Sequence, residues 1–198
     1  MDLNPERELR YAKMLPVTGQ EAQASARQAR NRYLVRPAGE HDLDAIAEFE
    51  VDIARVSFGD EAITDPAFHR RRVAGAVGKA AEITLVAVAA DAPDVPLGWA
   101  WMSARTNSLT GERYGNFRSL AITGPDRITS QDPAAEATPR LGELLMAAIL
   151  QAADEAGFTH LSGKVNAANL GMRSLYRAFG FSATHLTMEK RTRQDGPS

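Results

Sequence analysis

The chain has 198 residues, enough for one domain with a substantial core and a short appendage. Its apolar content of 44%, charged content of 24% and formal net charge of -2 are ordinary for a globular protein and do not indicate a nucleic-acid partner. It has no cysteine, which excludes disulfides, thiolate metal ligands and a cysteine nucleophile. No apolar signal segment or membrane-spanning run is visible, so we expect a cytoplasmic protein that binds no membrane.

Residues 1–32 are polar, rich in Glu, Gln, Ala and Arg, and interrupted by Pro16 and Gly19. We expect them to form an N-terminal helical appendage that adds little to the core. Packing on the domain, formation of a homodimer and a loose arm all stay open as its arrangement. The domain proper is expected over residues 33–190, and a flexible tail over residues 191–198.

The apolar pattern of the domain alternates between the spacing of strands and that of helices. The first strand stops at Pro37, because proline cannot donate to a continuing ladder. A hairpin follows later, with a loop of several residues expected around Pro93 and Pro96. In chain order we expect a strand at 33–37, helices at 41–56 and 66–81, strands at 83–90, 97–104 and 114–122, a helix at 141–156, a strand at 159–165, a helix at 167–179 and a strand at 182–190.

This order predicts an α/β fold with a mixed sheet. The hairpin is antiparallel, whereas a helix between the strands at 114–122 and 159–165 requires a parallel crossover. Residues 124–139 contain three prolines and no periodicity, so we expect a long loop there.

The segment from Asn169 to Phe181 is the most informative part of the chain. It predicts a helix that an asparagine amide can cap and that Gly180 ends, with the phenol of Tyr176 between them. A Leu-Tyr pair alone on a helix is more often core packing than chemistry. The full spacing through Gly180-Phe181 favours a functional role instead.

This segment resembles the late motif of the GCN5-related N-acetyltransferase (GNAT) family, in which asparagine, Leu-Tyr and Gly-Phe recur at the same spacing. The resemblance extends over about residues 33–190. It implies a GNAT-like, mostly antiparallel sheet with a central parallel strand pair flanked by helices. It also implies that Asn169 and Tyr176 contact acetyl-CoA, and that Tyr176 is the catalytic acid for the departing thiolate, since a phenol with a pKa of about 10 can supply that proton.

A second resemblance lies at residues 117–122 and 140–145. The family's strand pairs through its backbone with pantetheine, and the N–H groups of the following loop hold the pyrophosphate at a helix N-terminus. Gly142 matches the last glycine of that loop, but Arg140 replaces the first glycine and Ala137 the usual Gln or Arg. The Arg140 side chain is itself a candidate phosphate contact. The cofactor contacts implied here are Leu120, Ala121, Ile122, Arg140, Leu141, Gly142, Glu143 and Leu144.

The general base is not identified by the resemblance. Many relatives carry a glutamate where this chain has Asn116, and an amide cannot accept a proton at neutral pH. Another residue acts, the amine arrives neutral, or no transfer occurs; all three stay open. Acidic residues in and after the first helix are candidates for a substitute base, and Glu50 is the one we take as catalytic. An acidic group there could equally serve to attract a cationic amine. The candidates are Glu48, Glu50, Asp52, Asp60 and Glu61.

Other conspicuous residues have plainer interpretations. Trp99 and Trp101 share one face of a strand and are expected in the core rather than in an acceptor pocket. The basic run at residues 69–72 is expected to be a solvated helix face. The four histidines are scattered without metal-ligand spacing, so no metal is expected.

The sequence therefore predicts acetyl transfer from acetyl-CoA to the primary amine of a small molecule or peptide, by direct attack with backbone N–H groups holding the oxyanion. The alternative is a non-catalytic acyl-CoA-binding or interaction module on the same fold, which Asn116 and the altered loop favour. The acceptor and the length of the acyl chain are not predicted.

Overall fold

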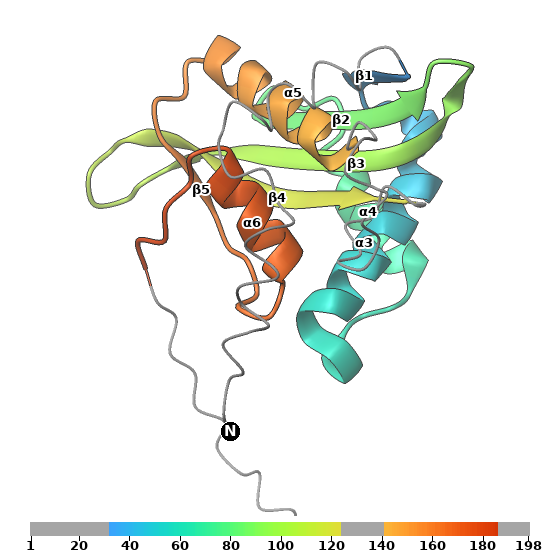
Figure 1. Cartoon of the computed structure of the whole chain (residues 1–198), viewed down its shortest axis with the longest axis horizontal. Coiled ribbons are helices and arrows are strands. Elements are labelled where there is room, and N and C mark those ends of the chain that lie inside the picture. The colour runs from blue at the N-terminus through green and yellow to red at the C-terminus, as the bar shows by residue number, and fades with distance from the viewer. Residues whose placement is uncertain (1–31, 124–140, 186–198) are drawn as a thin grey trace, which may run out of the picture.

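The computed structural model describes residues 32–123 and 141–185 (Figure 1). In these residues one five-stranded sheet follows chain order. β1 to β4 are successively antiparallel, whereas β5 is parallel to β4. The predicted mixed, mostly antiparallel α/β sheet is confirmed. The strands are β1 (Tyr33–Pro37), β2 (Glu82–Ala89), β3 (Ala92–Thr106), β4 (Arg113–Ile122) and β5 (Leu161–Gly163).

Helices cover both faces of the sheet (Figure 1). On one face lie α3 (Leu43–Phe58) and α4 (Pro66–Ala74), and on the other α5 (Leu141–Glu155) and α6 (Leu170–Ala178). Short 3-10 turns, η1 (Glu40–Asp42) and η2 (Gly59–Glu61), flank α3. Each face has its own apolar core, because alternate residues of a strand point to opposite sides.

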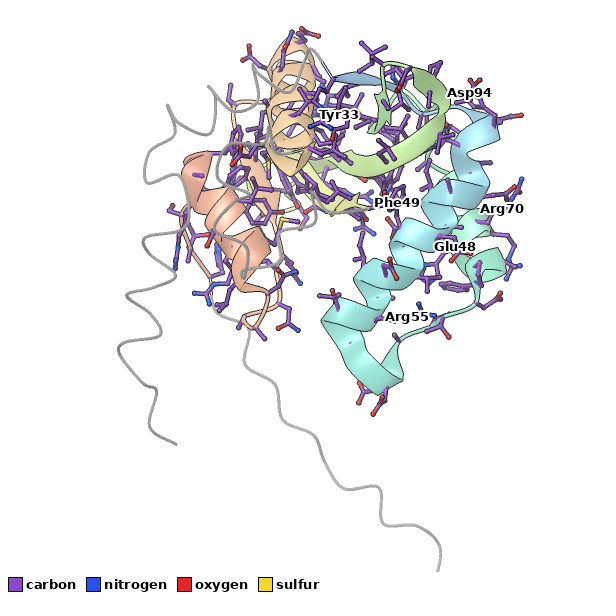
Figure 2. All side chains as sticks on the ribbon, turned by 45° about the vertical axis from the view of Figure 1, so that its right-hand side comes forward. Tyr33, Glu48, Phe49, Arg55, Arg70 and Asp94 are labelled. Atoms are coloured by element: carbon purple, nitrogen blue, oxygen red, sulfur yellow. The ribbon has the colours of Figure 1, made fainter. Side chains whose placement is uncertain are left out.

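The two tryptophans of β3 lie in the core beneath α3 and α4, as predicted. Trp99 is 0% and Trp101 5% exposed. Phe49 points from α3 into the same core (Figure 2). Each indole N–H reaches a carboxylate: Trp99 Nε1 donates to Glu50 Oε1 at 2.8 Å, and Trp101 Nε1 donates to Glu82 Oε2 at 2.6 Å. These bonds satisfy polar groups that burial would otherwise leave without partners.

Several boundaries differ from prediction. The β2–β3 loop is not several residues long, because Ala92 already pairs with Ala89. The prolines that follow lie within β3, where shifts in the pairing register accommodate them. α4 ends at Ala74, before Gly75 and the positive-φ Gly78. β5 is shorter than expected, since only Leu161–Gly163 pair with β4.

Other expectations fall wholly or partly outside the described residues. Residues 182–185 are not in a strand, and the rest of the strand expected to residue 190 is not described. The appendage at 1–31, the loop at 124–139 and the tail at 191–198 are likewise not described. In the described sheet the parallel pair lies at one edge rather than in the centre. No helix in this part of the chain is long and apolar enough to cross a membrane.

Candidate functional site

The candidate site begins where β4 and β5 part. Three residues of β4, Gly115 to Phe117, pair with β5, and the last pair joins Phe117 to Gly163. β4 continues to Ile122, so residues 118–122 have no strand partner on that side within the described residues. We call the point where the strands part, at Phe117 and Gly163, the β4–β5 fork.

A β-bulge sits directly at the fork. Trp101 of β3 pairs with Ser119 and Met102 pairs with Phe117, which leaves Arg118 as an extra residue in β4. A bulge reverses the side to which the following residues point and increases the local twist. The side chains of β4 therefore change sides, and the strand twists, at the point where it leaves β5.

Beyond the bulge, the backbone has hydrogen-bonding groups that pair with no strand of the described sheet. Thr123 donates its N–H to Leu97 O of β3 at 2.8 Å. Because successive residues of an antiparallel strand alternate in direction, Ala121 also faces β3, whereas the N–H and C=O groups of Leu120 and Ile122 face the open edge. An extended molecule that contains amides can pair with this edge as an added strand.

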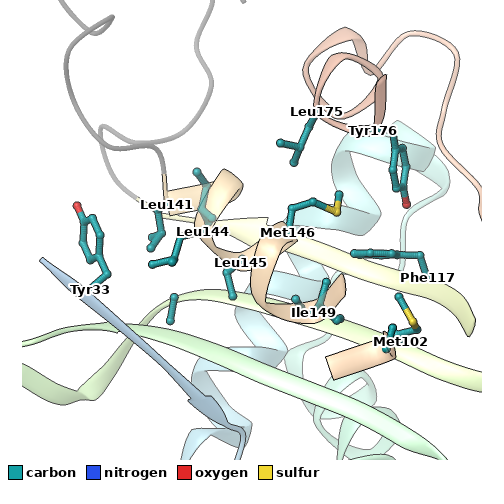
Figure 3. Packing of buried hydrophobic residues seen from close by; sticks show 14 of the residues in the cluster. Tyr33, Met102, Phe117, Leu141, Leu144, Leu145, Met146, Ile149, Leu175 and Tyr176 are labelled. Atoms are coloured by element: carbon teal, nitrogen blue, oxygen red, sulfur yellow. The ribbon is translucent and has the colours of Figure 1, made fainter. Parts of the chain in front are cut away.

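Tyr176 is oriented by the ends of α6. Asn169 caps the helix, its Oδ1 accepting from the Met172 N–H at 3.0 Å, which confirms the predicted amide cap. The Tyr176 ring lies edge-on to Phe117 (Figure 3), with the two ring centroids 5.7 Å apart. The centroid of the Phe181 ring lies 4.7 Å from that of Tyr176. The capping bond occupies the Asn169 oxygen, and a cofactor contact by this residue stays a prediction.

The Tyr176 hydroxyl lies at the fork. A Cβ atom added to Gly163 would be 2.5 Å from Tyr176 Oη, so the phenol oxygen rests against the last paired residue of β5. Tyr176 is 9% exposed, and burial raises its pKa to about 12. The phenol is therefore protonated at neutral pH and can donate a hydrogen bond.

The first turn of α5 adjoins the far end of the open edge. A Cβ atom at Gly142 would lie 3.9 Å from Ile122 Cδ1 and 4.0 Å from Leu175 Cδ2, the nearest described atoms. Among the described residues the packing thus leaves room for a methyl group, although glycine inside a helix costs about 1 kcal/mol relative to alanine. A glycine that packing does not require fits a place where a ligand approaches the backbone.

The other predicted contacts of this turn lie beside Gly142. Leu141, Glu143 and Leu144 are buried, and Arg140 lies outside the described residues. The Glu143 carboxylate suits a helix N-terminus but repels a phosphate, so an anion bound here uses the backbone N–H groups.

Glu50, the predicted base, is held in the α3–sheet interface. Its side chain is 1% exposed; Oε1 accepts from Trp99, and Oε2 forms an ion pair with Arg72. Both oxygens are thus engaged, which favours a structural role for Glu50, while its role as base stays an untested prediction. Asn116, at the position of the family's glutamate, pairs with Ser103 and Ser162 in the sheet.

The remaining acidic candidates stand at the surface. Asp52 is half-buried, and its Oδ1 lies 3.5 Å from Nη1 of Arg55. The other candidates are exposed. The exposed ones are Glu48, Asp60 and Glu61.

The basic run at residues 69–72 is only partly the solvated face that the sequence predicts. His69 is 5% exposed and its Nε2 lies 2.7 Å from Ile63 O. Arg72 points inward to Glu50 and to the ring of Trp101. Sequence reasoning missed Arg72 and Arg118 as neighbours of one indole, because no local spacing links residues so far apart in the chain.

No family model and no curated protein sequence matches the chain. Solved structures do match. A putative acetyl transferase from Pyrococcus furiosus has a TM-score of 0.61 at 16% identity, covering 81% of this chain and 99% of its own. An aminoglycoside antibiotic 6'-N-acetyltransferase from Acinetobacter baumannii has a TM-score of 0.56 at 13% identity, with 81% and 98% covered. A GNAT family acetyltransferase from Staphylococcus aureus has a TM-score of 0.54 at 10% identity, with 81% and 99% covered.

At these identities the likeness concerns the fold. The chain has the fold of the GNAT acetyltransferases, as the resemblance in its late motif predicts. The fold alone does not fix a reaction, so activity must be argued from the site.

Proposed function

We propose that the chain is an acyl-CoA-dependent N-acyltransferase that moves an acetyl group from acetyl-CoA to a primary amine. One observation carries the proposal: the buried Tyr176 hydroxyl lies against Gly163, at the fork from which β4 continues without β5. The similarity in fold to named acetyltransferases supports the same conclusion.

The residues present fit an extended thioester cofactor. The free backbone groups of Leu120 and Ile122 match the amides of pantetheine, and the α5 N-terminus at Gly142 matches its pyrophosphate. A cofactor bound along this line has its thioester beside Tyr176. The fit needs no metal ion.

In the reaction, the amine nitrogen attacks the thioester carbonyl, a C–N bond forms, and the C–S bond breaks. The N–H groups at the free edge of β4 are suited to hold the oxyanion. The amine loses one proton and the departing sulfur gains one, so no further reactant is required.

Tyr176 contributes a hydrogen bond to the departing sulfur rather than an early, complete proton transfer. A phenol with a pKa of about 12 is roughly 3.5 units less acidic than a thiol near 8.5. Burial of the phenol thus makes early, complete transfer of its proton less favourable. The proton therefore moves as the C–S bond breaks, and the amine's proton restores the phenol.

The base is a separate question. Because both oxygens of Glu50 are engaged, an amine that enters in its neutral form is the simpler route. In that case the rate rises about tenfold per pH unit below the pKa of the amine. Glu50 as base is tested by substitution below.

The test is calorimetry with acetyl-CoA, followed by thiol release over a panel of primary amines. We expect binding and release, and we expect Tyr176→Phe to lower turnover with little loss of acetyl-CoA affinity. Binding without release from any amine favours the second candidate, a non-catalytic acyl-CoA-binding module, which Asn116 supports. Absence of binding contradicts both functions.

A further inference from the structure

Two arginines share one indole next to the fork. The Cζ atoms of Arg72 and Arg118 lie 5.1 and 5.4 Å from the centroid of the Trp101 ring. The indole is 5% exposed, and its Nε1 is held by Glu82 at 2.6 Å. The ring is therefore a fixed support on which cation–π contacts hold both guanidinium groups.

The two guanidinium groups have different partners. Arg72 is paired with buried Glu50, and its side chain is 34% exposed. Burial, and then repulsion from Arg118, lower the pKa of Arg72. Arg118 is exposed and has no carboxylate partner within the described residues. Two like charges are thus held together, and among the described residues only Arg72 forms an ion pair.

Neither of the nearby carboxylates forms an ion pair with Arg118 in the described part of the chain. Both oxygens of Glu50 are bound to Arg72 and Trp99, and Glu82 Oε2 accepts from Trp101 and Ser103. Two guanidinium groups and two carboxylates leave the cluster without net charge, but Arg118 is the member that is exposed to solvent. An anion that reached it would meet a guanidinium already held in place.

The cluster adjoins the proposed reaction centre. Arg118 is the bulge residue, so it lies between the fork at Phe117 and Leu120, the first residue whose backbone groups face the open edge. Two residues along a strand span about 7 Å. The side chain of Arg118 lies over Trp101, on the α3–α4 side of the sheet.

We propose that the acceptor amine carries a carboxylate, which Arg118 binds with Arg72 beside it; this inference rests on the acyl transfer proposed above. A guanidinium binds a carboxylate through two parallel hydrogen bonds, which fixes orientation as well as position. The acceptor class is thus an amino acid or a peptide-like amine with a free carboxylate. Polyamines are disfavoured, since their charge repels both arginines.

The experiment compares matched acceptors: the ω-amino acids from β-alanine to 6-aminohexanoate, each against its own carboxamide. Both members of a pair present a primary amine on the same chain, but only one carries the carboxylate. We expect kcat/KM to favour the acid in at least one pair by about tenfold or more. Arg118→Gln is expected to lower that ratio by about tenfold. Arg71→Gln, the same charge change at an exposed residue of α4, is expected to preserve it.

Equal or better use of the carboxamides throughout the series overturns the proposal, as does an unchanged ratio in Arg118→Gln. If no amine releases thiol, the acyl-transfer function fails and the anion site is judged separately by binding. The NMR signal of the Trp101 indole N–H is then followed while 6-aminohexanoate or its amide is added. A shift that needs both the carboxylate and Arg118 supports the site, and any other result overturns it.

Discussion

The phenol of Tyr176 links the stability of the protein to alkaline pH. Burial raises its pKa from 10.0 to about 12, so the folded state holds the proton more tightly than the unfolded state does. This stabilisation is fully present below pH 10 and is lost as pH rises toward 12. Two units correspond to about 2.7 kcal/mol in all, of which about 1.3 kcal/mol is lost between pH 9 and pH 11.

The assay is the free energy of unfolding in urea, measured for the wild type and for Tyr176→Phe at pH 9 and at pH 11. Phenylalanine keeps the ring contacts with Phe117 and Phe181 but has no proton to lose. Other titrating groups are the same in both proteins and cancel in the difference. We expect the wild type to lose about 1.3 kcal/mol more than the variant. An equal loss in the two proteins refutes the burial of this hydroxyl at the fork.

Three substitutions test other parts of the site. Gly163→Ala places a methyl group 2.5 Å from Tyr176 Oη, so we expect kcat for thiol release to fall by about a hundredfold; unchanged turnover contradicts the placement of the phenol. Gly142→Ala is expected to raise the free energy of unfolding by about 0.5–1 kcal/mol while calorimetry shows weaker acetyl-CoA binding; unaltered affinity counts against a cofactor at the α5 N-terminus. Glu50→Gln weakens charge-assisted bonds to Arg72 and Trp99 and is expected to lower stability by about 1–3 kcal/mol, with the shape of the pH–rate profile preserved. If the pH–rate profile of Glu50→Gln lacks an acidic limb that the wild type shows, Glu50 is the general base.

Local patterns in the sequence predicted most elements of the described fold. α3 and α5 follow from apolar residues at helical spacing, and the amide cap of Asn169 follows from its place before a helix. The β2–β3 loop was predicted wrongly because prolines usually mark loops, whereas here register shifts accommodate them within β3. That adjustment depends on how two strands pair, which a single stretch of sequence does not reveal.

In the candidate site, too, local motifs were predictable and contacts between distant segments were not. Tyr176 was identified by a motif within one helix, and the structure places its hydroxyl against Gly163. Arg118 escaped notice because its position depends on the bulge opposite Trp101 and on α4 packing over the same ring. The engagement of Glu50 likewise depends on an indole 49 residues later in the chain. Such contacts arise from tertiary packing and carry no local signal.

The free edge of β4 is tested most directly by amide hydrogen exchange with and without acetyl-CoA. We expect the N–H groups of Leu120 and Ile122 to gain protection when the cofactor binds, because they face the open edge. The Ala121 N–H faces β3 and is expected to change little. Unchanged exchange at Leu120 and Ile122 while acetyl-CoA is bound would contradict the proposed cofactor site.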